Sequence, residues 1–190
     1  MQNSMEYEAK VLLSESEYEK LLNALMKFNP DKITQTNYYI DNDNLELHKL
    51  GLGLRIRAIG KYYEMTLKTP LKKGIKETTT TLSDEQFNTY LNSKNIQNEI
   101  TNSLTHRINN LHIVGSLKTI RIECKIATHI ICLDKSYYND HIDYELEVES
   151  TSKETAEAFL KDLLKSNSIT FKEFNKITKH KRALMAIKKE

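Results

Sequence analysis

The sequence predicts an α+β protein in which antiparallel strands, about eight of them, close into a barrel or tunnel with a charged interior, covered by helices. Three observations lead to this prediction. Segments of strand length alternate polar and apolar residues, other segments repeat apolar residues with helical spacing, and the alternating segments carry their charges on like faces. One domain, residues 1–190, is expected because the chain has no repeat, no low-complexity linker and 2 prolines.

The balance of charges argues against several classes of protein. Charged residues make up 28% and hydrophobic residues 39% of the chain, and the formal net charge is +2. These values disfavour a disordered tail or a bulk polyanion binder. The pI of about 8.3 is too mild to indicate a nucleic-acid partner. No apolar run reaches the roughly twenty residues of a membrane span and the N-terminus lacks a signal-peptide layout, which predicts a cytoplasmic protein without a membrane partner.

The first predicted strand is MEYEAKVLL (5–13), which places Glu6, Glu8 and Lys10 on one face and apolar residues on the other. The other predicted strands are QTNYYID (35–41), LGLRIRAIG (52–60), KYYEMTLKTP (61–70), IKETTTTL (75–82), LKTIRIECKI (117–126), THIICLDKS (128–136) and IDYELEVES (142–150). Cys124 and Cys132 are expected to be reduced thiols on adjacent strands, since two cysteines cannot form a disulfide framework.

Helical periodicity connects these strands. An apolar stripe with helical spacing runs from Tyr18 to Met26, and a second runs from Ala156 to Leu164 with Ser152 as its N-cap. The capping-box pattern SDEQ opens a shorter helix at Ser83. A last helix is expected over about 175–188, and the Asn-rich region 92–113 is expected to hold short helix and loop.

Charged faces recur on five strands. Arg55 and Arg57 share one face of their strand, and so do the sets Glu64, Thr66 and Lys68; Arg121, Glu123 and Lys125; and Glu145, Glu147 and Glu149. The helices need the apolar faces, so the charged faces point together, either to solvent from a flat sheet or into a closed barrel. Unpaired buried ions cost several kcal/mol each, so a charged interior must be wet and hold a ligand. Arg and Lys suit a phosphate chain, and clustered carboxylates suit Mg²⁺ or Mn²⁺.

These motifs resemble the CYTH superfamily of triphosphate tunnel metalloenzymes, which includes class IV adenylate cyclases and thiamine triphosphatases. EYEAK resembles the family's ExExK signature, and the resemblance continues in order through LRIR, EMTLK, the KE of IKETTTT, the TIR of LKTIRIE, LDK, DYELEVE and KITKHKRAL. It covers nearly the whole chain and is strongest to the compact single-domain members of low-GC Gram-positive bacteria.

The resemblance implies a role for each charged position. It implies metal ligands at Glu6, Glu8, Glu145 and Glu147, acidic residues near the metal or the attacking water at Glu77 and Asp134, and phosphate contacts at Lys10, Arg55, Arg57, Lys68, Arg121 and Lys179. Thr119 stands where many relatives have a Lys, so Lys118 or Lys125 could supply that contact. Glu149 is interpreted as a rim residue.

The resemblance implies an enzyme, a triphosphatase dependent on Mg²⁺ or Mn²⁺. The substrate is left open among inorganic triphosphate, thiamine triphosphate and a nucleoside triphosphate. The alternatives are an adenylate cyclase, or a module that binds triphosphate or polyphosphate and regulates a protein partner. Tyr38 and Tyr39 could stack on a base or a thiamine ring, although packing is favoured for aromatic residues on a half-buried strand. The basic end of the chain is interpreted as a solvated helix end, apart from Lys179 and Arg182.

Overall fold

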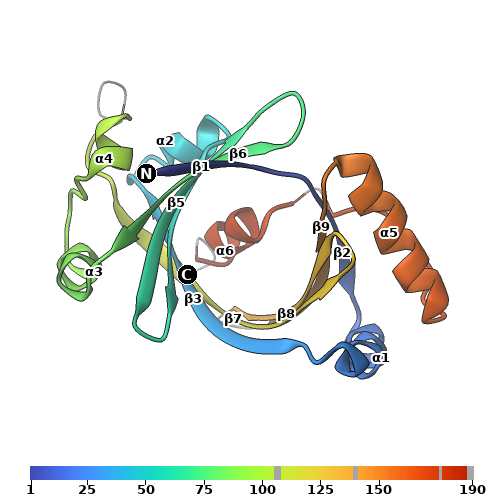
Figure 1. Cartoon of the computed structure of the whole chain (residues 1–190). Coiled ribbons are helices and arrows are strands. Elements are labelled where there is room, and N and C mark those ends of the chain that lie inside the picture. Colours follow the sequence, from blue (N-terminus) through green and yellow to red (C-terminus); the bar gives the residue numbers. More distant parts are fainter. Residues whose placement is uncertain (105–107, 139–140, 176, 188–190) are drawn as a thin grey trace. The chain divides into compact units, whose positions relative to one another are not determined.

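The computed structural model describes residues 1–104, 108–138, 141–175 and 177–187. It is an α+β protein with a nine-stranded sheet in the order β1-β6-β5-β4-β3-β7-β8-β9-β2 (Figure 1). The strands are β1 (Gln2–Glu6), β2 (Glu8–Leu13), β3 (Asp31–Asp41), β4 (Gly53–Ile59), β5 (Tyr62–Pro70), β6 (Ile75–Leu82), β7 (His112–Ile126), β8 (His129–Tyr137) and β9 (Ile142–Glu149). The predicted α+β class and antiparallel sheet are confirmed, while closure into a tunnel stays a prediction.

The predicted number of strands was one too low, because the first predicted strand is two strands. β1 ends at Glu6 and neighbours β6, whereas β2 begins at Glu8 and pairs with β9. The chain changes its hydrogen-bonding partner at Tyr7, whose carbonyl accepts a hydrogen bond from the Ser150 amide at 3.0 Å. Alternation of faces therefore cannot be carried from Glu6 to Glu8 as it can along one regular strand.

The helices are α1 (Glu15–Leu25), α2 (Glu46–Lys49), α3 (Asp84–Leu91), α4 (Glu99–Asn102), α5 (Lys153–Ser166) and α6 (Lys179–Ile187), with a short 3-10 turn at Met26–Phe28. Helices α1, α3 and α5 lie close to their predicted positions, whereas α2 was not predicted. Ser83 and Ser152 cap α3 and α5 as predicted. The last helix begins four residues later than expected, and Lys176 and Lys188 of the predicted span lie outside the described residues. None of the described helices is long and apolar enough to cross a membrane.

Two compact units make up the chain. Unit 1 comprises Met1–Met5, Gln35–Leu117 and Lys179–Glu190, and unit 2 comprises Glu6–Thr34 and Lys118–Thr178. The division passes through β3 and β7. Each unit has its own apolar core on one side of its strands. The prediction of one domain stays a prediction.

In unit 2 the apolar face of β2, β7, β8 and β9 packs against α1 and α5 (Figure 1). Val11, Leu133, Leu146 and Val148 point to this core and are at most 4% exposed. Ser14 caps α1 with a capping box, and Leu21 and Leu25 on its buried stripe are fully covered. Burial of such side chains is worth about 1.5–3 kcal/mol each, which fixes one face of the strands as the inner one.

In unit 1 the apolar face of β4 and β5 carries Leu54, Ile56 and Met65, all fully buried. α3 and α4 contribute Phe87, Tyr90 and Ile100 to the same cluster. Because side chains alternate along a strand, burying this face turns Arg55 and Arg57 to the opposite one. The fold of each unit thus has an apolar face under helices and a polar face that displays the predicted site residues.

Candidate functional site

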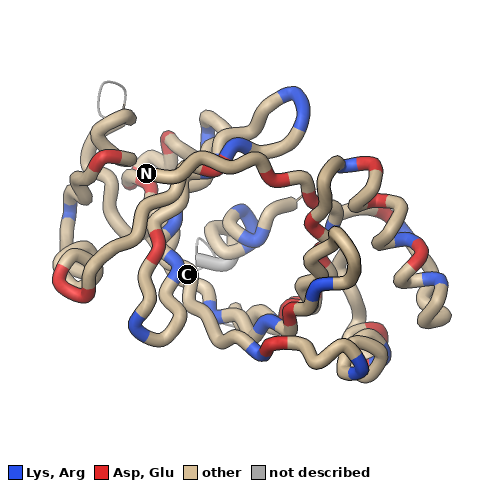
Figure 2. The backbone as a smooth tube through the Cα atoms, in the orientation of Figure 1, with Lys and Arg blue, Asp and Glu red and all other residues tan. Residues whose placement is uncertain are grey.

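The polar face of unit 2 is a ladder of charged side chains, here called the acidic face. Strand pairing sets Lys10 opposite Glu147 and Leu12 opposite Glu145 on β2 and β9, and it sets Asp134 opposite both Glu145 and Arg121. The acidic face consists of Glu8, Lys10, Arg121, Glu123, Asp134, Glu145, Glu147 and Glu149. Figure 2 marks the acidic positions of β2 and β9 in red. Opposite residues are about 5 Å apart at their Cβ atoms, so these groups interact directly.

Arg121 is the centre of this ladder. Its Nε donates to Asp134 Oδ1 at 2.8 Å, and its Nη2 donates to Asp134 Oδ2 and to Glu147 Oε2, both at 2.7 Å. Arg121 and Glu147 are 7% exposed and Asp134 is fully buried. Burial disfavours the charged guanidinium, but Asp134 and Glu147 outweigh burial and raise the pKa of Arg121 well above its usual value. Arg121 and Asp134 thus form a buried bidentate ion pair on the acidic face.

Lys10 forms the second cation contact of the acidic face. Its ammonium group pairs with the Glu8 carboxylate two residues earlier on the same side of β2. Burial lowers the pKa of Lys10, but the carboxylates of Glu8, Glu147 and Glu145 together raise it by more than burial lowers it. The pKa of Lys10 is therefore above its usual value. The position between three carboxylates makes Lys10 the counter-cation of the predicted metal ligands.

The remaining predicted residues of unit 2 are placed as follows. Glu145 is 1% exposed and accepts a hydrogen bond from Asn175 Nδ2 at 2.8 Å. Thr119 lies opposite Ser136, and their hydroxyl oxygens are 3.0 Å apart. Glu6 is half-buried at the end of β1, and Glu149 is half-buried at the end of β9. Glu8, Glu145 and Glu147 therefore share one face, whereas Glu6 belongs to a separate strand.

The donor set of the acidic face fits a hard divalent cation by its chemistry. Carboxylate oxygens are the preferred ligands of Mg²⁺ and Mn²⁺, and Glu8 and Glu147 flank Lys10 on neighbouring strands. Among the described residues, however, no three acidic, histidine or cysteine side chains already converge on one ion position. The reason lies in the contacts above, because the carboxylates of Glu8 and Glu147 point to Lys10 and Arg121.

The polar face of unit 1 carries the other predicted phosphate contacts and is here called the basic face. Pairing sets Arg55 between Tyr39 and Thr66, and Arg57 between Asn37 and Glu64. Lys68 lies opposite Glu77, and their charged groups are 2.8 Å apart. The face consists of Asn37, Tyr39, Arg55, Arg57, Glu64, Thr66, Lys68, Glu77 and Thr79.

Buried polar atoms of the basic face lack hydrogen-bond partners. Arg55 Nε and Asn37 Oδ1 are buried, and neither has a partner within the described ranges of the chain. A buried guanidinium nitrogen without an acceptor costs free energy, so native proteins rarely keep one without a ligand to satisfy it. An anion is the group that would satisfy Arg55.

Helix α6 adds more cations to the basic face. Tyr39 is 3% exposed, and its ring stacks on His180 of α6 with 4.6 Å between ring centroids. Burial raises the pKa of Tyr39, while the charges of Arg55, Lys179, Arg182 and Arg57 oppose that rise. These four cations therefore lie near enough to Tyr39 for their charges to act on its hydroxyl group. Figure 2 shows the basic positions of α6 in blue.

His180 is held as a neutral ring in this cluster. Burial lowers its pKa to about 4, with His48 and Arg55 adding to the effect and Asp41 opposing it. The His48 and His180 rings meet edge to face with centroids 6.1 Å apart. A neutral imidazole lets α6 pack against Tyr39 without adding a further buried charge beside Arg55.

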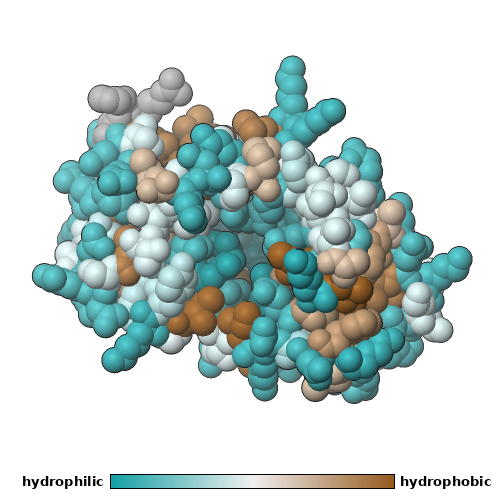
Figure 3. Space-filling view, viewed as in Figure 1, coloured by the Kyte–Doolittle hydropathy of each residue, from teal (hydrophilic) through white to brown (hydrophobic). Residues whose placement is uncertain are grey.

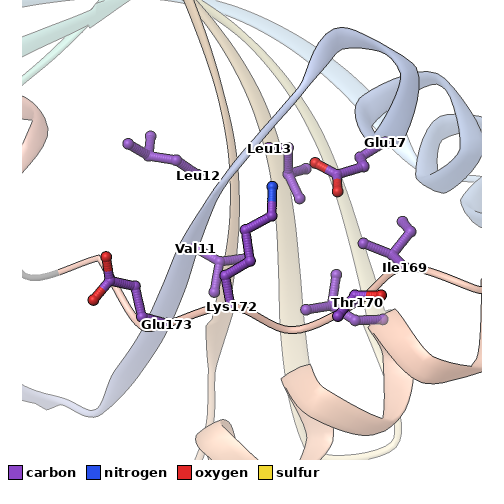
Figure 4. A pocket seen from close by; sticks show the side chains of 9 residues that line it. Val11, Leu12, Leu13, Glu17, Ile169, Thr170, Lys172 and Glu173 are labelled. Atoms are coloured by element: carbon purple, nitrogen blue, oxygen red, sulfur yellow. The ribbon is translucent and has the colours of Figure 1, made fainter.

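Two surface hollows of unit 2 lie beside β2 and the segment that follows α5. The hollow in Figure 4 is lined by Val11, Leu13, Ile169, Lys172 and neighbouring residues, and its volume of about 20 Å³ is suited to a single water molecule. An open groove of about 540 Å³ at the end of β2 has a mixed lining, four apolar residues (Leu12, Leu13, Phe174, Ile177) and four polar or charged ones (Ser14, Lys172, Glu173, Asn175). Asn175 of this lining also donates to Glu145 of the acidic face. Figure 3 shows hydrophobic side chains in separate groups on a mostly hydrophilic face.

Sequence reasoning missed Tyr39, Asn37 and His180 as neighbours of the predicted phosphate contacts. The signal for the first two was the alternation of β3, which puts both on one face once the pairing of β3 with β4 is known. The packing interpretation holds for Tyr38, whose ring contacts Phe87 in the apolar cluster. No periodicity could have shown that His180 stacks on a residue 141 positions earlier in the chain.

The chain is similar to known proteins over nearly its whole length. The family model of the CYTH domain matches residues 4–180. The candidate triphosphatase YjbK of Bacillus subtilis (strain 168) is 30% identical over 177 residues, which are 91% of this chain and 92% of that protein. The structure of a candidate adenylate cyclase from Bacillus halodurans is 34% identical with a TM-score of 0.82, covering 93% of this chain and 97% of that one.

A more distant structure shows the same fold. It is that of HpAC1, a candidate adenylyl cyclase from Hippeastrum described as having a dominant triphosphatase activity. It is 22% identical with a TM-score of 0.81, and the match covers 94% of this chain and 95% of that one.

Proposed function

The chain belongs to the CYTH domain family, and from this premise we propose that it is a divalent-metal-dependent enzyme that hydrolyses a triphosphate. Candidate substrates are inorganic triphosphate, thiamine triphosphate and a nucleoside triphosphate. The similarity to YjbK of Bacillus subtilis, named as a candidate triphosphatase, supports this reaction class. The name of the Hippeastrum structure, which reports a dominant triphosphatase activity, is in accord with it.

One observation carries the proposal. Arg55 keeps a buried nitrogen without an acceptor among the described residues, on a face where the charges of Arg57, Lys179 and Arg182 also act on the neighbouring Tyr39. A buried, unsatisfied donor on a face with several further cations is suited to a polyanion of small size, because each phosphate oxygen can accept charge-assisted hydrogen bonds. A triphosphate has enough oxygens to engage them together.

The two faces are proposed to serve different parts of the reaction. Arg55, Arg57, Lys68 and Lys179 would bind phosphate oxygens and hold the phosphate chain in one orientation. Glu8, Glu145 and Glu147, with Glu6, would hold Mg²⁺ or Mn²⁺. When bound, such an ion supplies charge neutralisation and lowers the pKa of a coordinated water. Phosphoryl transfer needs positioning and charge neutralisation more than a covalent nucleophile, so fixed Arg and Lys groups suit the chemistry.

Glu77 and Asp134 are proposed to act on the attacking water or beside the metal. Their surroundings differ, since Glu77 pairs with Lys68 and is partly exposed, whereas Asp134 is fully buried and accepts two hydrogen bonds from Arg121. A partly exposed carboxylate can reach a solvent molecule. Glu77 is therefore the stronger candidate for the water, and Asp134 the stronger one for orienting Arg121.

The experiment is to measure phosphate release and cyclic AMP formation from inorganic triphosphate, thiamine triphosphate and ATP, with Mg²⁺, with Mn²⁺ and with chelator. The proposal expects phosphate release that stops in chelator. Cyclic AMP without phosphate release from the other substrates would instead favour the cyclase, the activity named for the 34% identical Bacillus halodurans structure. Tight triphosphate binding with no product from any substrate would favour a regulatory binding module.

Variants test the metal part of the proposal. Glu147→Gln and Glu6→Gln remove carboxylates and should raise the metal concentration needed for half-maximal turnover while the fold is kept. Lys72→Ala is a matched surface control, because Lys72 is exposed in the turn between β5 and β6. Full turnover by the wild-type protein in chelator would contradict the assignment of metal dependence.

A further inference from the structure

The predicted metal ligands of the acidic face are already neutralised by cations of the protein. Glu8 pairs with Lys10, and Glu147 accepts a hydrogen bond from Arg121 at 2.7 Å. Lys10 has 12% of its side chain exposed and Glu8 has 15%, so water screens their attraction only in part. A divalent ion that approaches Glu8 or Glu147 must therefore compete with an ammonium or a guanidinium group.

We propose that Lys10 is a specificity-determining residue that excludes the free metal ion from the acidic face and admits it together with a triphosphate. This inference rests on the proposed function. The phosphate chain offers Lys10 a second anionic partner, and when Lys10 turns to a phosphate oxygen the Glu8 carboxylate is released for the metal. The exchange gives Lys10 a new direct partner, whereas entry of the metal alone would set its charge beside a partly buried ammonium that has lost its direct ion-pair partner, Glu8.

The surroundings of Lys10 favour a change of ion-pair partner, from carboxylate to phosphate, at Lys10 rather than at Arg121. Arg121 has its Nε and one terminal nitrogen fixed by the two oxygens of the fully buried Asp134, which holds the guanidinium plane in place. Lys10 lies on β2, an edge strand of the sheet order, and its flexible side chain has one direct ion-pair partner among the residues whose contacts are described, Glu8. A lysine on a flexible stem can change partner at lower cost than a bidentate arginine.

The consequence is a thermodynamic coupling between metal and triphosphate. If the triphosphate draws Lys10 away from Glu8, it removes the competitor of the metal ion. The triphosphate and the metal then raise each other's affinity by the same factor, which is typically about 5–150-fold for such couplings. The acidic face would then select the metal–triphosphate complex over the free ion. Removal of the competitor should by itself release the carboxylate, with no triphosphate present.

The test is the affinity of the protein for Mn²⁺ alone, measured by the electron paramagnetic resonance signal of the free ion and by calorimetry. Lys10→Met keeps the length of the side chain and removes its charge, and it should tighten Mn²⁺ binding at least tenfold. Lys135→Met is the matched control. Lys135 is on β8 next to Asp134 but faces the opposite side, where its ammonium lies 5.2 Å from the centre of the Tyr144 ring, and its loss should change Mn²⁺ affinity less than twofold.

A double-mutant cycle identifies the carboxylate for which Lys10 competes. In a Glu8→Gln background, Lys10→Met should change Mn²⁺ affinity less than threefold, because the shared partner is gone. Unchanged or weaker Mn²⁺ binding by Lys10→Met, or an equal gain in Lys135→Met, would overturn the inference. If wild-type protein hydrolyses triphosphate and Lys10→Met gains no Mn²⁺ affinity, the inference alone fails. If Lys10→Met gains affinity and no variant hydrolyses any triphosphate, the proposed function alone fails.

Discussion

The acidic face of unit 2 and the basic face of unit 1 differ in how their charges are neutralised. On the acidic face, Lys10 and Arg121 lie against carboxylates of the same strand or of the neighbouring strands. On the basic face, the buried Nε of Arg55 has no acceptor in the described part of the chain, and the charges of four cations act on Tyr39. The cations of the acidic face are therefore neutralised without a ligand. On the basic face Lys68 is likewise paired with Glu77, whereas Arg55 carries the cost of a missing acceptor.

This difference separates stability from function in the two units. A cation that neutralises buried carboxylates is needed for folding, so its removal should mainly cost stability. A buried cation that lacks an acceptor destabilises the fold, so its removal should mainly weaken the binding of the anion. The same residue type, arginine, thus has opposite expected effects at positions 121 and 55.

The largest expected effect is on the folding of unit 2. Arg121→Ala leaves the fully buried Asp134 carboxylate without its bidentate partner, and the free energy of unfolding should fall by about 3–5 kcal/mol. Urea unfolding measures this loss. Arg55→Ala serves as the comparison and should change the free energy of unfolding by less than about 1 kcal/mol, in either direction. Equal losses in the two variants would remove the distinction between the faces.

The next effect is on triphosphate binding. Arg55→Ala and Arg57→Ala should each raise the triphosphate concentration for half-maximal turnover, or for protection against thermal unfolding, by roughly ten- to a hundredfold, as expected for loss of a hydrogen bond between charged groups. Lys72→Ala should leave it unchanged. A similar shift in Lys72→Ala would show that net charge, not the basic face, governs binding.

Glu77 allows the chemical step to be separated from binding. Glu77→Gln keeps the shape of the side chain opposite Lys68 and should preserve triphosphate affinity while turnover falls well over tenfold, a loss above about 1.4 kcal/mol in transition-state stabilisation. Calorimetry and initial rates together measure the two quantities. A parallel loss of affinity and turnover would make Glu77 a partner of Lys68 rather than a catalytic group.

The last effect concerns the contact between α6 and Tyr39. His180 is neutral in the folded protein down to its lowered pKa of about 4, whereas in the unfolded chain it takes up a proton near the ordinary histidine pKa of about 6.5. Stability from this group is therefore complete above about pH 6.5 and is lost as the pH falls toward 4, by at most about 1.4 kcal/mol per pH unit. Partial exposure of the ring reduces this slope.

His180→Phe keeps an aromatic ring against Tyr39 and removes the titration. The variant should lose less stability than the wild type between pH 6.5 and 4.5, and the two should change in parallel between pH 7 and 8. Urea unfolding at each pH measures the difference. The same slope in both proteins would show that other groups cause the acid sensitivity.

Much of the fold could be predicted from the sequence, because alternation and capping are local. The strands that carry Arg55, Lys68 and Glu147 lie where the alternation placed them. Helix α2 was not predicted, because its amides at Leu47 and His48 are capped by the Asp41 carboxylate from six or seven residues upstream. The break at Tyr7 was also missed, since it results from a change of partner strand.

The contacts within the candidate site were beyond sequence reasoning. Alternation assigns Arg121 and Asp134 to their faces but cannot set one opposite the other, because that requires the register of β7 and β8. The prediction that Arg121 binds phosphate was made without knowledge of its three hydrogen bonds to Asp134 and Glu147. The roles of the site residues stay predictions until they are tested by variants.

The central claim is that the acidic face binds the metal and the basic face binds the triphosphate. The most direct test is a crossed titration of turnover with Glu147→Gln and Arg57→Ala. The metal concentration for half-maximal turnover should rise in Glu147→Gln alone, at saturating triphosphate. The triphosphate concentration for half-maximal turnover should rise in Arg57→Ala alone, at saturating metal. Equal shifts of both concentrations in both variants would contradict the division between the two faces.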